Sequence, residues 1–382
     1  MTWEVVHGDC MDVMRGIECA DAIVTDPPYG LEFMGKDWDH GIPGVPFWEA
    51  ALRAANPGAH LLAFGGTRTH HRLMCAIEDA GWEIRDCLMW VYGSGFPKSL
   101  DVSKAIDKAA GAERQKQKIG KAVKRMIPGA DQNNTGSWIK DNGREYQPGR
   151  EMPATDAAKQ WDGWGTALKP AYEIIILARK PLTGTVAANV QEHGTGGLNI
   201  DGCRVGNELL PEQRAGEARL GAFERQDMVT PERYGRWPAN VIHDGSEEVM
   251  GAFPATNSTR VNNPNEPKRS GGWTGDGIGH DHRDFGSAAR FFYCAKASRS
   301  ERGEDNGHPT VKPIALMRWL CRLVTPSGGL ILDPFCGSGS TGVAAVFEGF
   351  RFVGIDDKPD YCEIARKRIA AANEQTIMEL EA

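Results

Sequence analysis

Short apolar runs bounded by turn residues recur along the chain. Their length and apolar content are typical of buried strands in a sheet rich in parallel pairs. The runs cover residues 3–6, 22–25, 59–64, 84–90, 172–178, 329–333 and 351–356. Helix-like segments fill several of the intervals, over residues 47–56, 68–80, 312–323, 341–348 and 359–373. This alternation predicts a doubly wound α/β layer.

Two long regions interrupt the alternation. Residues 93–170 combine a basic segment with a stretch that contains Gly, Asn and Trp, and residues 183–306 are rich in Gly, Pro, Asn and charge. Loops of that length inside a compact domain usually carry a function or are disordered. We therefore expect both regions to be inserted material carried by the sheet, without a second independent core.

The composition narrows the class of protein. The 382 residues, 41% hydrophobic and 25% charged, are enough to bury a substantial core. We expect a cytoplasmic protein with no membrane partner, because no apolar stretch approaches a span and the first residues do not resemble a signal peptide. The nine cysteines form no Cys-x-x-Cys pair, which favours buried reduced thiols. No metal site is expected, since His280 and His282 lack further ligands nearby in the sequence.

The net charge of −7 is unevenly distributed. Residues 93–150 contain twelve Lys or Arg against six Asp or Glu, so this segment carries +6 and the remainder −13. A basic segment in an acidic chain indicates a local contact with a polyanion, although a solvated basic loop is an equally common explanation.

A glycine-rich loop stands near the C-terminus. A predicted strand ends at Asp333, glycines follow at 337, 339 and 342, and the next predicted strand ends at Asp356. Glycines allow a ligand to approach the backbone closely, and an acid after the second strand suits a ribose diol, so we expect a nucleoside site. A nicotinamide enzyme would also satisfy the glycines, but Asp333 would repel a pyrophosphate and attract a positively charged aminoacyl nucleoside.

The glycine loop lies unusually late in the chain. Only 26 residues follow Asp356, although a nucleotide-binding sheet requires further strands. Those strands must come from the N-terminal half. The chain is therefore expected to be circularly permuted, with a catalytic half first and a cofactor half last.

The stretch IVTDPPYG, residues 23–30, follows another predicted strand. Its prolines fix the backbone and leave carbonyl acceptors exposed, while Asp26 adds an acceptor and Tyr29 a flat ring. These groups suit a planar base whose exocyclic amine is hydrogen-bonded to Asp26 and to the carbonyl of Pro27, with its lone pair aimed at a methyl group. A turn that merely closes a strand is the alternative.

These motifs together resemble the permuted, beta group of amino-directed DNA methyltransferases that use S-adenosylmethionine. DPPY (26–29) is similar to the catalytic motif of that family, DPFCGSGST (333–341) to its cofactor loop and HPTVKP (308–313) to the motif before that loop. HGDC (7–10) and GID (354–356) match further cofactor-side positions. The stretches GSGFPKS, NIDGCRV and RFFYCAKASRSER are similar to phage and prophage members of the group.

The resemblance implies a Rossmann-like, mostly parallel sheet of seven strands in the order 3-2-1-4-5-7-6, with residues 3–6 as strand 3 and an inserted target-recognition region. Together with the charge pattern it predicts five parts. Residues 1–92 form a catalytic half, 93–170 a basic insert that contacts DNA, and 171–182 a strand that returns to the sheet. Residues 183–306 form a target-recognition region and 307–382 a cofactor half.

The resemblance also assigns roles to residues. Asp26, Pro27, Pro28 and Tyr29 would hold a flipped target base. Asp9 would approach the cofactor's adenine, Thr310 and Lys312 its carboxylate, and Asp356, where the family more often has Glu, its ribose. The implied cofactor contacts are Asp9, Asp26, Thr310, Lys312, Asp333, Phe335, Gly337, Gly339 and Asp356.

A base inside a duplex cannot reach such a pocket, so it must be flipped out or come from a single strand. Trp90 or Phe96 could stack on it, with core packing as the alternative for Trp90. The expected DNA contacts are Phe96, Lys98, Arg114, Lys116, Lys118, Lys121 and Lys124, and residues 183–306 would read the bases.

Adenine N6 is the favoured target, because Asp opens the motif, whereas Ser is common in enzymes that methylate cytosine N4. The cytosine enzyme remains the main alternative. Methylation of cytosine C5 is disfavoured, since it requires a nucleophilic thiol and the chain has no Pro-Cys. An NAD-dependent oxidoreductase is a distant alternative, and intact Asp26 and Tyr29 argue against a catalytically inactive DNA-binding protein. The sequence leaves the oligomeric state open, a homodimer included.

Overall fold

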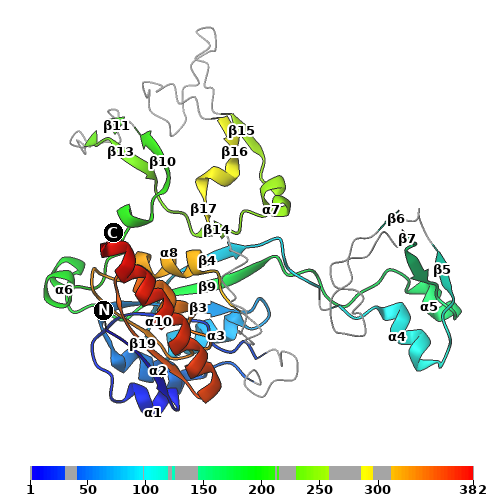
Figure 1. Ribbon diagram of the computed structural model, residues 1–382, viewed down its shortest axis with the longest axis horizontal. Helices are drawn as coiled ribbons and strands as arrows, with labels where there is room; N and C mark the ends of the chain where they lie inside the picture. Colours follow the sequence, from blue (N-terminus) through cyan, green and yellow to red (C-terminus); the bar gives the residue numbers. More distant parts are fainter. Residues whose placement is uncertain are drawn as a thin grey trace, which may run out of the picture. The chain divides into compact units, whose positions relative to one another are not determined.

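A mixed sheet of nine strands organises the larger part of the chain, in the order β1-β19-β18-β2-β3-β9-β4-β14-β17 (Figure 1). The computed structural model describes residues 2–30, 41–97, 99–118, 123–124, 145–210, 213–214, 229–257, 285–295 and 311–381. In sheet order, the strands are β1 (Trp3–His7), β19 (Arg351–Asp356), β18 (Leu330–Asp333), β2 (Ala20–Thr25), β3 (Ala55–Gly65), β9 (Tyr172–Arg179), β4 (Glu83–Val91), β14 (Val241–His243) and β17 (Tyr293–Cys294).

The sheet is mostly parallel. Strand β9 runs antiparallel to both of its neighbours, β3 and β4, whereas the other neighbouring pairs are parallel. The seven segments predicted as strands occupy consecutive positions from β1 to β4. The predicted count of seven is too low, because β14 and β17, from the region 183–306, extend the sheet beyond β4.

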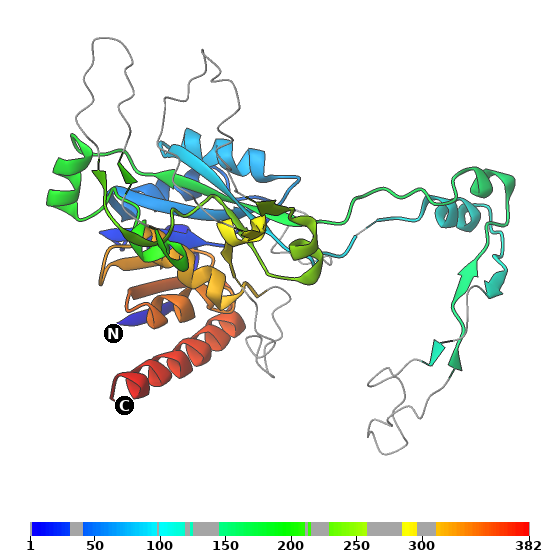
Figure 2. The ribbon, with the colours of Figure 1, turned by 90° about the horizontal axis from the view of Figure 1, so that it is seen from above.

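Helices cover both faces of the sheet (Figure 2). One face packs against α8 (Ile314–Val324), α9 (Ser340–Phe347) and α10 (Pro359–Glu381), and the other against α1 (Cys10–Met14), α2 (Val45–Ala54) and α3 (His70–Asp79). Successive side chains of a strand point to opposite faces, so Leu62 and Phe64 of β3 join the first core and Leu61 and Ala63 the second.

The region 183–306 adds small elements to the same unit. Besides β14 and β17 it forms the helices α6 (Val186–His193), η3 (Asp201–Cys203), α7 (Glu247–Ala252) and η4 (Ala288–Phe291). Three two-stranded sheets join β10 (Val205–Leu210) with β13 (Arg233–Arg236), β11 (Gln213–Arg214) with β12 (Val229–Thr230), and β15 (Ala255–Asn257) with β16 (Phe285–Ser287). His280 and His282 lie outside the described residues.

Residues 95–170 form a compact unit of their own, separate from the unit made of residues 1–94 and 171–382. The elements of this smaller unit are α4 (Val102–Ala109), α5 (Asp156–Gln160), and the strand pairs β5 (Lys116–Lys118) with β8 (Gly149–Glu151) and β6 (Val123–Lys124) with β7 (Glu145–Tyr146). The sequence predicted that residues 93–170 are an insert without a core of its own, whereas residues 95–170 form a compact unit.

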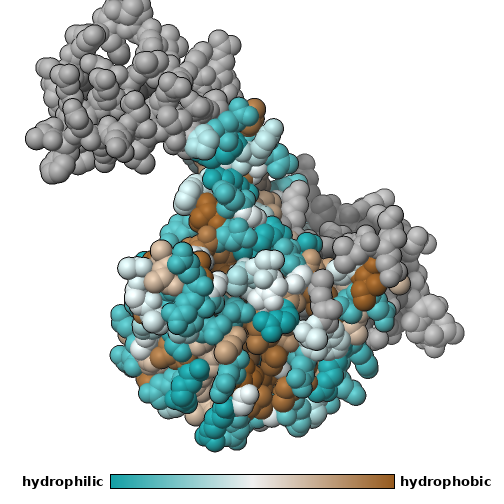
Figure 3. Space-filling view, turned by 90° about the vertical axis from the view of Figure 1, so that its left-hand side faces the viewer, coloured by the Kyte–Doolittle hydropathy of each residue, from teal (hydrophilic) through white to brown (hydrophobic). Residues whose placement is uncertain are grey.

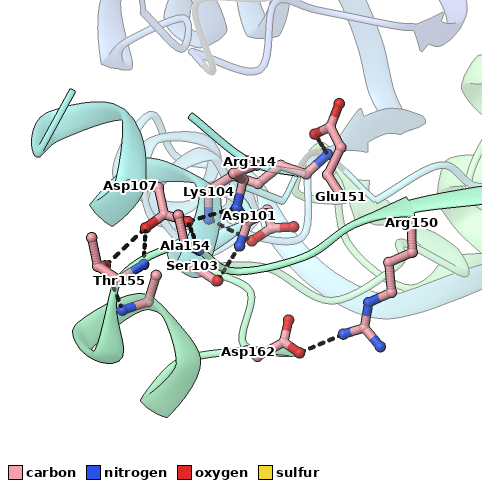
Figure 4. A network of polar contacts seen from close by, with 11 residues as sticks. Asp101, Ser103, Lys104, Asp107, Arg114, Arg150, Glu151, Ala154, Thr155 and Asp162 are labelled. Carbon is pink, nitrogen blue, oxygen red and sulfur yellow. Dashed lines mark hydrogen bonds and ion pairs between the residues drawn. The ribbon is translucent and has the colours of Figure 1, made fainter. Parts of the chain in front are cut away.

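A buried carboxylate organises the smaller unit (Figure 4). Asp107 accepts hydrogen bonds from Arg114 Nε at 2.7 Å, Ala154 N at 3.0 Å and Thr155 Oγ1 at 2.8 Å. Burial raises the pKa of Asp107, but these donors outweigh burial and hold the pKa well below its ordinary value. A polar network therefore joins α4 to the segment before α5, in place of a large apolar core.

The described surface is mainly hydrophilic on the face shown in Figure 3, where hydrophobic residues form smaller groups between polar ones. Within the described parts of the chain, no helix is both long and apolar enough to span a membrane. The nine cysteines form no disulfide, and five of them are buried.

Candidate active site

The two predicted loops meet at the carboxyl ends of neighbouring strands. Strands β2 and β18 pair directly, with Ile23 opposite Leu332. At their ends Thr25 Oγ1 donates a hydrogen bond of 2.6 Å to Asp333 Oδ1, which also accepts from the Phe335 amide at 3.1 Å. The DPPY loop and the glycine loop, far apart in the sequence, therefore begin side by side.

Asp333 brings a buried negative charge to this junction. The residue is 2% exposed, and burial raises the pKa of its carboxyl to about 6, against the opposing effect of hydrogen bonds from Thr25, Thr341 and the Phe335 amide. Among the described residues no basic side chain forms an ion pair with it. A carboxylate that is ionised at neutral pH and has no cationic partner is suited to receive a cationic ligand.

The glycine loop has the backbone geometry of a ligand cradle. Gly337 and Gly339 have φ angles of +51° and +80°, which favour glycine. Gly337 N donates to Asp356 Oδ2 at 2.8 Å, so the acid after β19 is held by the loop after β18. Beside them, Phe335 packs its ring on Phe47, with 6.1 Å between centroids.

Asp9 lies at the next strand end, after β1. Its carboxylate accepts a 2.8 Å hydrogen bond from Met11 N and caps α1. The neighbouring Gly8 N donates to the carbonyl of Asp356 at 3.0 Å. Asp9, Asp356 and Asp333 therefore stand at the carboxyl ends of three adjacent parallel strands, where ligands bind in open α/β sheets.

A charged cluster surrounds the catalytic motif. Lys312 Nζ lies 2.7 Å from Asp26 Oδ2, 3.2 Å from Glu173 Oε2 and 3.1 Å from the Tyr29 hydroxyl. The Tyr29 hydroxyl lies within hydrogen-bond distance of both acids, 2.8 Å from Asp26 Oδ1 and 3.1 Å from Glu173 Oε2. Two carboxylates, one ammonium and one phenol thus form a single network.

Burial and charge act on this network in opposite directions. Lys312 is 8% exposed, and burial alone lowers its pKa, but Asp26 and Glu173 outweigh burial and raise the pKa above its ordinary value. Burial, followed by the charges of Asp26 and Glu173, raises the pKa of Tyr29 well above 10.0. At neutral pH the lysine is therefore charged and the phenol neutral.

The end of strand β4 supplies Trp90, and the next residue after the strand is Tyr92, so two aromatic side chains lie next to this network. Trp90 pairs with Glu173 across the sheet, and its ring lies 5.0 Å from that of Tyr92. Burial and Glu173 raise the pKa of Tyr92 to about 12, while Lys312 lowers it. Trp90 packs against the hydrophobic core, which was the alternative to base stacking for this residue. Its indole nitrogen is buried without a hydrogen-bond partner among the described residues.

The residues expected to contact DNA differ in their surroundings. The side chain of Arg114 is 10% exposed and pairs with buried Asp107. Lys116 and Lys118 are exposed on β5, and Phe96 is 78% exposed. Lys98, Lys121 and the side chain of Lys124 lie outside the described parts, as does Thr310 of the expected cofactor set.

Glu173 is the site residue that sequence reasoning missed. It is an acid near the start of the apolar run YEIIILA. Because β9 is antiparallel, the start of this strand lies at the edge where β2 and β3 end. An acid at that position was a usable signal once the strand direction was known.

Most of the chain matches one known protein family. The family model described as "DNA methylase" matches residues 20–367. The chain belongs to this DNA methylase family. The cofactor of the DNA methylases is S-adenosyl-L-methionine. Within the described residues, no group of three or more His, Cys, Asp or Glu could hold a metal ion.

Relatives of this DNA methylase match it over limited segments. Type II methyltransferase M2.DpnII of Streptococcus pneumoniae is 52% identical over 67 residues, 18% of this chain and 25% of the relative. DNA adenine methyltransferase YhdJ of Escherichia coli K12 is 35% identical over 77 residues, 20% and 26% of the two chains. Type II methyltransferase M.ScaI of Streptomyces caespitosus is 35% identical over 138 residues, 36% and 41% of the two chains.

Two solved structures are similar over nearly the whole chain. The complex of M1.HpyAVI with SAM has a TM-score of 0.42 and 15% identity, and covers 97% of this chain and 99% of that chain. The cytosine-N4-specific PvuII DNA methyltransferase has a TM-score of 0.44 and 12% identity, and covers 98% and 93%.

Proposed function

We propose that the protein transfers a methyl group from S-adenosyl-L-methionine to the exocyclic N6 of an adenine flipped out of DNA, and that it belongs to the permuted beta group. The observation that carries the proposal is the junction of Thr25 and Asp333, which brings the DPPY loop beside the glycine loop. Two reactants held at such neighbouring loops gain most of their rate from proximity and orientation.

We assign the cofactor to the strand ends of β18, β19 and β1. Asp333 supplies a buried carboxylate for a cation, Gly337 and Gly339 let the backbone approach closely, and Asp356 is placed for a ribose diol. Phe335 and Asp9 line the same edge. When bound, the cofactor supplies an activated methyl group on a positively charged sulfur.

We assign the target base to the DPPY loop. Asp26 and the carbonyl of Pro27 accept the protons of the exocyclic amine, which turns its lone pair toward the cofactor side. Pro28 stiffens the loop and the ring of Tyr29 stacks on the base. The loop is braced by Thr69, whose hydroxyl donates a 2.7 Å hydrogen bond to the Tyr29 carbonyl.

Adenine is preferred to cytosine because Asp26 opens the catalytic motif. The relative YhdJ is named as an adenine enzyme, which agrees with this choice. Methylation of cytosine N4 is the second candidate, since the same loop presents the same acceptors to either amine. We further propose that residues 183–306 read the DNA sequence and that the unit 95–170 contacts the backbone.

The test is sequencing of modified bases in DNA from cells that express the protein and lack other methyltransferases. N6-methyladenine within a defined motif is the expected result, and Asp26→Ala is expected to abolish it. Asp79→Ala, an exposed acid at the end of α3, is the matched control and is expected to retain it. N4-methylcytosine would favour the second candidate, and unmodified DNA would reject the proposed function.

A further inference from the structure

We propose that Glu173 and Lys312 are positioning residues for methyl transfer, which hold the Asp26 carboxylate and the Tyr29 ring in their reactive orientations. The inference rests on the proposed function. It adds Glu173, and it gives Lys312, which the resemblance assigned to the cofactor's carboxylate, a place beside Asp26 and Glu173. It comes from the charged cluster around the DPPY motif, in which the Lys312 ammonium and the Tyr29 hydroxyl each have defined neighbours.

The hydrogen-bond capacities of the cluster match. A lysine ammonium has three donors, and Lys312 has three acceptors in reach: Asp26 at 2.7 Å, Glu173 at 3.2 Å and the Tyr29 hydroxyl at 3.1 Å. The single phenol proton of Tyr29 is directed to one of the two acids. A carboxylate accepts at about four positions, so Asp26 keeps acceptor capacity for the amine of the target base.

The net charge of the cluster explains why two acids are required. One ammonium and two carboxylates sum to a single negative charge, so Lys312 can orient Asp26 without neutralising the site. Without Glu173, the buried ammonium would be balanced by Asp26 alone, and the pair would be tighter and less available to a base. Without Lys312, two carboxylates would face each other through one phenol, which favours proton uptake by the pair.

The cluster is built on rigid elements. Glu173 lies on β9 between two strands, and Lys312 directly precedes Pro313, the N-cap residue of α8. The ammonium of Lys312 lies 4.7 Å from the centroid of the Phe64 ring and 5.4 Å from that of Tyr29, which fixes it against the sheet. Groups held this way set the orientation of a neighbouring catalytic side chain.

The first experiment separates orientation from binding by measuring kcat and KM for DNA methylation. Glu173→Ala should lower kcat by about 10²-fold while KM for both substrates stays within about twofold, the expected pattern for a lost transition-state orientation. Glu173→Gln keeps an acceptor for Lys312 and Tyr29 and should recover part of that loss. Glu192→Gln, an exposed acid on α6, is the control and should match the wild type.

The pH profile of kcat provides a readout that a purely structural role would not change. Lys312 faces Asp26, Glu173 and Tyr29 directly. The charges of Glu173 and Lys312 also act on Tyr92, and that of Asp26 acts on Asp333. Lys312→Met should move the acid limb of the profile to higher pH, because the remaining carboxylates take up a proton more readily. Lys312→Arg should move it less, and the control Lys367→Met should leave it in place.

A third measurement requires no turnover. Lys312→Met should lower the melting temperature, and adding Glu173→Gln should raise it again, because the second change removes the repulsion that the first exposed. Additive melting temperatures, or a wild-type kcat for Glu173→Ala in an enzyme that methylates DNA, would overturn the inference and leave the proposed function intact. If the melting temperatures of the variants are coupled but the wild-type protein transfers no methyl group, the proposed function is rejected and the positioning role with it.

Discussion

At the scale of single residues, burial of the Asp333 carboxyl costs stability. Its carboxyl has an ordinary pKa of 3.8 and a folded-state pKa of about 6, raised by burial. Well below pH 3.8 both states hold the proton, and well above pH 6 both have lost it. Between these values the folded protein binds more protons than the unfolded chain, so the contribution of this residue to stability falls as pH rises.

Asp333→Asn should therefore remove a pH-dependent loss of stability. The free energy of unfolding of the wild type, relative to that of the variant, should fall by about 2 kcal/mol between pH 4 and pH 6.5, at ~1.4 kcal/mol per pKa unit. Chemical denaturation at a series of pH values measures this difference. Asp79→Asn, an exposed substitution, should show no such trend, and a flat difference for Asp333→Asn would contradict the assignment of a raised pKa.

Gly339 is a second residue whose surroundings limit what can replace it without loss of stability. Its φ is +80°, and a Cβ built there would lie 2.9 Å from the Cβ of Ala365 on α10. Gly339→Ala should destabilise the protein by about 2–5 kcal/mol, which combines backbone strain with overpacking. Gly328→Ala, where φ is +68° and nothing lies within 4 Å, should cost only the strain of ~1–2 kcal/mol. Thermal unfolding of both variants tests the difference, and equal losses would exclude the packing contribution.

At the scale of elements, one amide fastens α6 to the sheet. Asn189 is fully buried, donates to the carbonyls of Pro57 and Thr195 at 2.9 Å each, and accepts from Thr183 N at 2.8 Å. Through Asn189, helix α6 is therefore bound to the first residues of β3 and to the segments that precede and follow the helix. This contact secures the start of the region 183–306 on the sheet.

Asn189→Ala should leave the amide of Thr183 and the carbonyl of Thr195 without their side-chain partner, whereas the carbonyl of Pro57 still accepts from the Thr195 hydroxyl. At ~1–3 kcal/mol for each unsatisfied group, the loss should be about 2 kcal/mol or more. Gln191→Ala on the exposed side of the same helix should change stability by less than ~0.5 kcal/mol. Urea denaturation measures both, and a loss near that of Gln191→Ala would show that water replaces the lost amide.

The same scale shows which features the sequence could predict. The seven strands that run from β1 to β4 in sheet order were found because each has three or more apolar residues between turn signals, and the DPPY and glycine loops followed from their ends. Strands β14 and β17, of three and two residues, are too short to show a period. A count of charges does not reveal that Asp107 pairs with Arg114, and Glu173 needed the direction of β9.

At the scale of the whole molecule, not every basic residue of the unit 95–170 is available to a polyanion. Four basic residues of the unit 95–170 are already paired with acids, as Lys104 with Glu151, Arg114 with Asp107, Arg150 with Asp162, and Lys159 with Asp156. Lys116 and Lys118 on β5 are exposed, and no ion pair is found for either within the described residues. Together with Lys121 and Lys124 they remain the proposed DNA contacts.

Replacing these four lysines by glutamine should weaken DNA binding and flatten its salt dependence. Each phosphate contact contributes about 0.9 to the slope of log K against log salt, so losing four should reduce the slope by about 3 to 4. The pair Lys116→Gln and Lys118→Gln should account for about half, measured by fluorescence anisotropy at several salt concentrations. Arg15→Gln with Arg53→Gln changes the net charge equally on exposed positions of the other unit and is the control. Equal slopes for the two pairs would show that overall charge governs the binding, and an unchanged slope for all four would remove this unit from the interface.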